Sequence, residues 1–204
     1  MKSASTLRSR SRALAGLLVA FTCGPAEAHL NTTGMGPVYD GLMHFVTSPE
    51  DLVPVLALAL LAGLRGARYG RRAMLALPVA WLLGSLCGLF AALTSAGPLA
   101  ASLWFLVLGG LVLVDAKVSP RLLTALCALL GLFHGYLNGT GMGFSVQAIA
   151  AVLGVAGAVF VVVVLVAALV VRLRAQWGRI AVRVGGSWIA ASGLLMFGWF
   201  IRGT

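Results

Sequence analysis

Six long apolar blocks decide what this chain can fold into. Each approaches the roughly 20 residues that a helix needs to cross the hydrocarbon core of a bilayer. Of the 204 residues, 60% are hydrophobic and only 10% are charged, so few polar residues remain to cover a soluble surface. The blocks therefore predict an all-α integral membrane protein with a bundle of six transmembrane helices, near residues 50–64, 73–94, 98–115, 122–140, 146–171 and 180–201.

The first 28 residues have the pattern of a secretory signal peptide. Basic residues come first, an apolar core of about ten residues follows, and Ala26-Glu27-Ala28 has the form of a cleavage site. Cleavage after Ala28 would leave residues 29–204 as a six-helix membrane domain. An uncleaved N-terminal anchor is the alternative.

Basic residues between the blocks indicate the orientation of the bundle. They cluster in "RGARYGRR", "AKVSPR" and "RLRAQWGRIAVR", whereas the connections around 95–98 and 138–145 carry no Lys or Arg. By the positive-inside rule the three basic loops are cytoplasmic, so both mature termini face the periplasm. We therefore expect a multi-pass protein of the bacterial inner membrane. The net charge of +10 reflects this topology, with the lipid bilayer as partner, and we expect no nucleic acid.

Ionisable residues inside the predicted helices mark a candidate site. Burying a charged side chain near the centre of a membrane helix costs about 2.5 kcal/mol or more of free energy unless the group is paired or hydrated. Counted at 1.5 Å per residue from Arg65, Glu50 and Asp51 lie about 20 Å above the inner boundary. Counted in the same way from Arg121, His134 also lies about 20 Å up. Carboxylates and an imidazole from two helices are thus predicted to share one level in the outer part of the membrane.

Each of these residues also has a structural interpretation. Ser48 and Pro49 form a good helix start, and carboxylates in the first turn favour the helix dipole, which alone could explain Glu50 and Asp51. His134 and Asn138 are four residues apart and share one helix face. They could form a polar clasp between helices with Asn138 as a cap, or a metal site with an imidazole ligand.

Several weaker candidates surround this pair. Asp40 and His44 are four residues apart on a short amphipathic segment at the outer interface, and Met142 could add a thioether at the mouth. His29, as the mature N-terminus, would combine an imidazole with a free amine and could capture Cu(II) or Ni(II). Cys87 reaches the same level, although packing is the favoured explanation. We expect Asp115 to pair with Lys117 at the cytoplasmic boundary.

Two motifs resemble those of a known family. "GLMHFVTSPEDLVPVLALALL" resembles the first-helix motif of the HupE/UreJ family, and "HGYLNG" resembles its His-Gly-x-x-His-Gly motif in the fourth helix. The resemblance implies a small bacterial permease for nickel or cobalt that serves the maturation of metalloenzymes such as hydrogenase or urease. The matching positions are His44, Glu50, Asp51, His134 and Asn138. Oxygen-bearing side chains replace two of the family's imidazoles, which raises the alternative of a harder ion such as Mn or Fe.

We therefore expect an inner-membrane permease that takes up a divalent transition-metal ion from the periplasm. Nickel is the favoured ion, with cobalt, Mn, Fe or Cu as alternatives, and no permanently bound cofactor is expected. The membrane potential contributes about 2.3 kcal/mol per charge per 100 mV, which is sufficient to drive uptake. The sequence contains no Walker A or G-x-S-x-G pattern, so we expect no enzyme. A non-transporting accessory protein that binds or delivers metal to a partner enzyme is the alternative.

Overall fold

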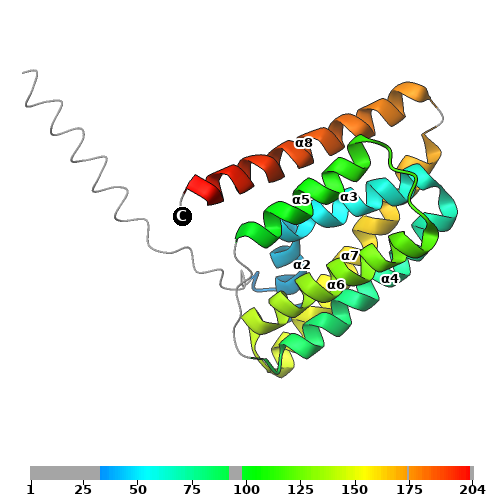
Figure 1. The fold of residues 1–204 in the computed structure, drawn as a ribbon. Helices are drawn as coiled ribbons and strands as arrows, with labels where there is room; N and C mark the ends of the chain where they lie inside the picture. The colour runs from blue at the N-terminus through cyan, green and yellow to red at the C-terminus, as the bar shows by residue number, and fades with distance from the viewer. Residues whose placement is uncertain (1–32, 92–97, 174, 203–204) are drawn as a thin grey trace, which may run out of the picture.

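The described part of the chain is entirely helical. The computed structural model describes residues 33–91, 98–173 and 175–202. Within these ranges it contains seven helices and no strand (Figure 1). The helices are α2 (Pro37–Thr47), α3 (Pro49–Arg65), α4 (Ala67–Gly88), α5 (Pro98–Leu113), α6 (Pro120–Met142), α7 (Val146–Arg172) and α8 (Gln176–Arg202).

Helix α3 lies at the centre of the bundle. It contacts all six of the other described helices and buries an almost continuous apolar run, including Val55, Leu58 and Leu61. Helices α4, α6 and α7 pack on one side of it, and α5 and α8 form a pair on the other (Figure 1). This central position explains why α3 is apolar nearly all round, because a helix surrounded by other helices has no polar face.

Glycines allow the closest helix contacts. On α6, Gly131, Gly135 and Gly139 recur at a spacing of four residues, and a Cβ on any of them would overlap the backbone or side chains of α4. On α4, Gly84 packs in the same way against the carbonyl of Leu132 on α6. Small residues at such positions let backbones approach each other, which is how helices associate where the surrounding solvent is lipid. The α4–α6 contact is therefore fixed in rotation as well as in distance.

The segment around Ser48 is a sharp bend. Helices α2 and α3 meet at 75°, and Ser48 is extended and serves as the N-cap of α3 with Pro49 in the first position, as the sequence indicates. Helix α2 includes the short amphipathic segment with Asp40 and His44. It packs against α7, where Gly41 lies on the carbonyl of Ala151. The bend brings the last turn of α2 and the first turn of α3 to the same place.

The helices have the composition of a membrane protein. Among the described residues, α6, α7 and α8 are each long and apolar enough to cross a membrane, and the bent pair α2–α3 would be a fourth span if counted together. Helix α5 is apolar but shorter. Helix α4 begins at Ala67, earlier than the predicted 73, because the arginines at 68, 71 and 72 continue the helix. The signal peptide predicted for residues 1–28 lies outside the described residues.

Ion pairs join the C-terminal ends of α3 and α5 to the first turn of α8. Asp115 follows α5 in a left-handed conformation (φ 51°) and pairs with Arg65 at the end of α3 and with Arg179 on α8. The Arg179 Nη2 nitrogen lies 2.9 Å from Asp115 Oδ2. The prediction that Asp115 pairs with Lys117 was wrong. Both oxygens of Asp115 accept from arginines, which are distant in the sequence and adjacent in the fold.

Candidate metal site

The candidate site begins with a buried pair between α3 and α6. The Nδ1 nitrogen of His134 lies 2.8 Å from Oδ1 of Asp51, and both side chains are almost fully buried. A carboxylate oxygen only accepts, so His134 donates from Nδ1. Asp51 stands in the first turn of α3 and His134 well inside α6. The structure thus brings together the two residues for which the sequence predicted one depth.

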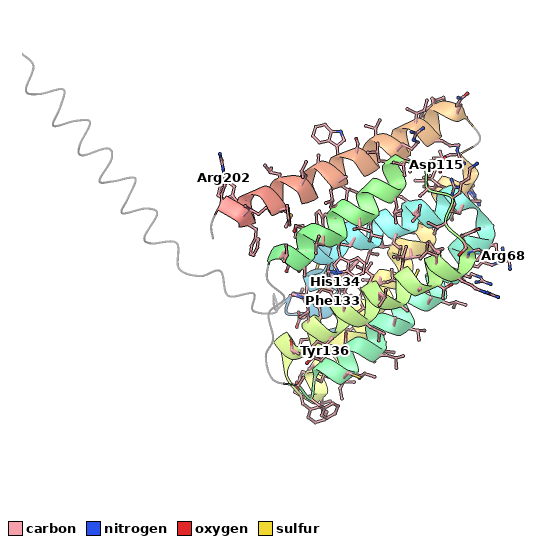
Figure 2. All side chains as sticks on the ribbon, viewed as in Figure 1. Arg68, Asp115, Phe133, His134, Tyr136 and Arg202 are labelled. Carbon is pink, nitrogen blue, oxygen red and sulfur yellow. The ribbon has the colours of Figure 1, made fainter. Side chains whose placement is uncertain are left out.

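Asn138 extends this pair into a network. Its Nδ2 nitrogen donates to Asp51 Oδ2 at 2.9 Å and to the carbonyl of His134, while its Oδ1 accepts from Nε2 of His44 at 2.9 Å. The role of a helix cap was wrong for Asn138, because α6 continues to Met142. The amide instead joins three helices. We call Asp51, His134, Asn138 and His44 the polar network (His134 is labelled in Figure 2).

The spacing of the motif explains how α6 serves two neighbours at once. His134 and Asn138 are one turn apart and face α3 and α2, whereas Gly135 and Gly139, each one residue further on, face α4. A Cβ at Gly135 would overlap the carbonyl oxygen of Trp81. In "HGYLNG" the polar residues therefore form the network, and the glycines allow α6 to pack closely against α4.

Aromatic rings surround the imidazole of His134. Trp81 of α4 stacks on it with ring centroids 5.6 Å apart, Phe133 lies edge-on at 5.4 Å, and Trp104 of α5 lies at 6.2 Å. Figure 2 shows His134 and Phe133 on α6, away from the end that holds Asp115 and Arg68, and of the two rings His134 is the buried one. Among these aromatic rings, Nε2 of His134 is buried and has no hydrogen-bond partner among the described residues. The ring thus offers one unused nitrogen.

The hydrogen bonds assign a role to each member of the polar network. Both oxygens of Asp51 are occupied as acceptors, so this carboxylate orients His134 and fixes its tautomer with the proton on Nδ1. Nε2 is then the lone-pair atom, the usual arrangement of a histidine that ligates a metal. No group of three His, Cys, Asp or Glu side chains in the described ranges could by itself enclose an ion. The site has one well-prepared nitrogen ligand and no complete protein coordination sphere.

The remaining candidates lie outside the network. Glu50 is exposed, one residue from Asp51 on another face of α3. Asp40 accepts two hydrogen bonds from Thr33, at 2.5 and 2.7 Å. Met142 packs against the apolar core, and Cys87 is exposed. His29 lies outside the described residues.

Sequence reasoning missed the part of the site that α4 supplies. Trp81 and Ser85 are fully buried beside the α6 glycines, and their Nε1 and Oγ atoms have no hydrogen-bond partner among the described residues. Neither residue is ionisable, so the rule that singles out charged residues in membrane helices passed over them. The available signal was their spacing, since residues four apart in an otherwise apolar block share one face.

A comparison with curated proteins finds no match, and neither does a comparison with solved structures. The sequence model of the family described as HupE / UreJ protein matches residues 17–196, which is most of the chain. This match includes both motifs and every residue of the polar network. The chain therefore belongs to the HupE/UreJ family.

Proposed function

We propose that this protein is a permease of the bacterial inner membrane that takes up a divalent transition-metal ion from the periplasm. The family is associated with nickel or cobalt transport and with metalloenzyme maturation. In this proposal the ion binds at Nε2 of His134. Asp51 orients the imidazole and supplies negative charge, and Asn138 connects both residues to His44 nearer the mouth.

The observation that carries the proposal is the unused Nε2 of His134. A buried polar atom without a partner costs about 1–3 kcal/mol, so a stable bundle retains one only where something else compensates it. Here the atom is a lone pair beside a buried carboxylate whose neighbours in the network are neutral donors. A bound cation would satisfy the nitrogen and balance the carboxylate at once.

The free imidazole favours nickel over a harder ion such as manganese. Manganese and magnesium prefer carboxylate and carbonyl oxygens, whereas imidazole suits nickel, copper, iron and zinc. Each oxygen of Asp51 already accepts one hydrogen bond, which leaves one lone pair on each. Within the polar network, the buried atom with no partner among the described residues is Nε2 of His134, an imidazole nitrogen. The ion would keep water molecules for its other positions.

The bend between α2 and α3 supports transport over binding alone. His44 lies in the last turn of α2 and Asp51 in the first turn of α3, so the helix is broken at the polar network. Discontinuous helices in transporters place helix ends and irregular backbone at the substrate site, where the chain is buried in protein. A continuous helix would serve a purely structural span equally well.

Charge positions support one cytoplasmic basic end for the bundle, and aromatic positions support α8 as a membrane span. The pairs of Asp115 with Arg65 and Arg179 bring the α3–α4, α5–α6 and α7–α8 connections together, and these are the three basic ones. On α8, Trp177 and Trp199 are both largely exposed and lie about 33 Å apart along the helix at 1.5 Å per residue. That spacing matches the two aromatic belts of a bilayer about 30 Å thick.

Uptake by proteoliposomes tests the proposal. Purified protein reconstituted into vesicles with an inside-negative potential should accumulate Ni(II), and His134→Ala should abolish accumulation at equal reconstitution. The comparison variant is His44→Ala, which removes an imidazole from the edge of the network. It should lower uptake and leave binding to the buried nitrogen.

The outcomes separate the two functions considered. Binding of Ni(II) through His134 without accumulation would replace the permease with the accessory protein that delivers metal to a partner enzyme. Equal accumulation by the unsubstituted protein and His134→Ala would remove the polar network from the pathway altogether.

A further inference from the structure

Ser85 differs from the other serines and threonines within the described helices. A hydroxyl in a helix commonly bonds to the carbonyl one turn earlier, and Thr47, Ser102, Thr124, Thr140, Ser187 and Ser192 all do so. Ser85 is fully buried, yet its Oγ has no hydrogen-bond partner among the described residues. Its hydroxyl has therefore not taken the local bond that satisfies the others.

One of the carbonyls one turn before Ser85 is pressed against α6. It belongs to Trp81, four residues earlier, and the bare Cα of Gly135 lies directly on it. The amide of Ser85 is also close to Gly135, so residues 81–85 of α4 lie alongside the residue that follows His134. Ser85 is thus held next to the turn of α6 that carries the imidazole.

Three unpartnered polar atoms lie in this region. They are Oγ of Ser85, Nε1 of Trp81 and Nε2 of His134, each buried and without a hydrogen-bond partner among the described residues. The indole of Trp81 stacks on the imidazole at 5.6 Å, which ties α4 to the candidate ligand directly. An oxygen acceptor, an N–H donor and a nitrogen lone pair are the groups that a hydrated cation uses together.

We propose that α4 forms a second wall of the ion site, with the Ser85 hydroxyl oxygen as a ligand of the ion held by His134 Nε2. The indole N–H of Trp81, which can only donate, would bond to a water that stays on the ion. The inference rests on the proposed function and adds to it an oxygen ligand outside the family motifs. One nitrogen and one neutral oxygen would then come from the protein, and water would supply the rest.

This wall would influence which ion is accepted. A neutral hydroxyl adds a hard oxygen ligand without a second negative charge, so it widens acceptance toward cobalt and manganese while leaving the imidazole as the main anchor. Replacing the oxygen by sulfur should move the preference toward thiophilic ions. A serine with a purely structural role would have no such effect on ion preference.

A cysteine at this position gives a direct spectroscopic test. Ser85→Cys loaded with Co(II) should show a sulfur-to-cobalt charge-transfer band in the near ultraviolet, because a thiol that coordinates a metal loses its proton. The unsubstituted protein, whose sequence has Cys23, Cys87 and Cys127, gives the background. The matched control is Ser102→Cys, since Ser102 is equally buried in α5 but bonds to the carbonyl of Leu99. It should show no band.

A second variant covers the case in which the larger sulfur disturbs packing. Ser85→Ala removes one atom, and it should weaken Mn(II) binding by about tenfold and Ni(II) binding by less. Ser102→Ala should change neither. The ratio of the two affinities is the informative quantity, because a general loss of folding would lower both together.

The results distinguish this inference from the proposed function. Co(II) absorption that depends on His134, without a thiolate band in Ser85→Cys and with an unchanged affinity ratio in Ser85→Ala, would overturn the α4 wall and leave the permease intact. Failure of the unsubstituted protein to bind any of the three ions would overturn both.

Discussion

Two carboxylates hold the two ends of α3 in place by opposite means. Asp51 accepts from a histidine and an asparagine, both neutral donors, and its side chain is 7% exposed. Asp115 accepts from two arginines and its side chain is 26% exposed. Each joins α3 to helices that are distant in the sequence. One end is therefore bound by a buried polar network and the other by partly solvated ion pairs.

The difference lies in what each arrangement leaves unsatisfied. At Asp115 two positive charges outweigh one negative charge, and the pairs need no further ligand. At Asp51 the donors orient the carboxylate without neutralising it, and the imidazole keeps a free nitrogen. Burial of an uncompensated charge is expensive, whereas a partly exposed ion pair stabilises the fold by only about 0–1 kcal/mol. Under the proposed function the first end receives a cation, and the second holds the bundle together.

The largest effect is expected from Asp51→Asn. An amide has a donor where Asp51 has an acceptor, so its N–H₂ group must face a donor: the amide of Asn138 or Nδ1 of His134. In the second case His134 would move its proton to Nε2 and lose the free lone pair. Titration calorimetry with Ni(II) should show about a 10–100-fold loss of affinity, the range for second-sphere partners of a metal ligand.

Glu50→Gln is the control for charge alone. Glu50 is the neighbouring acid and is exposed, so its loss should change Ni(II) affinity by less than about threefold, since exposed charges act through solvent. Similar losses in the two variants would mean that these acids attract ions in general. The distinct role assigned to Asp51 would then be wrong.

A smaller effect of a different kind is expected from Asp115→Asn. Asparagine tolerates the same left-handed backbone, so the change removes the charge and keeps the turn. Loss of two ion pairs should lower the free energy of unfolding by about 1–2 kcal/mol. Thermal unfolding in detergent measures this, and Ni(II) affinity should stay within about twofold.

The neighbouring cation provides the comparison for this variant. Lys117→Gln should leave the unfolding temperature unchanged, because the arginines and not Lys117 hold Asp115. A strong loss of Ni(II) affinity in Asp115→Asn would show that the two ends of α3 are coupled. The division between a site and a fastener would then fail.

Depth in the membrane could be predicted from the sequence, and lateral neighbours could not. A rise of 1.5 Å per residue placed Asp51 and His134 at one level, and the structure brings them into contact. The start of α3 at Ser48 and Pro49 also followed from local rules. These features depend on one helix at a time, and the apolar blocks define the helices well.

Partners across helices depend on rotation, which a single sequence does not encode locally. Asp115 was assigned to Lys117, two residues away, but its partners lie 50 and 64 residues away. Asn138 was weighed as a cap because the end of α6 was placed too early. Ser85 went unnoticed because its neighbours on α6 are glycines, whose role is visible only when the two backbones are in contact.

The smallest effect, and a direct comparison of the two ends, is expected from salt. The Debye length falls from about 10 Å at 0.1 M to about 3 Å at 1 M, so partly exposed pairs weaken while buried ones do not. Arg179 is 43% exposed and Asp51 only 7%, so screening should act at the Asp115 end. The stability difference between the unsubstituted protein and Asp115→Asn should shrink by about 0.5 kcal/mol at high salt. The difference for Asp51→Asn should not change, and equal salt sensitivity would show that water reaches both ends alike.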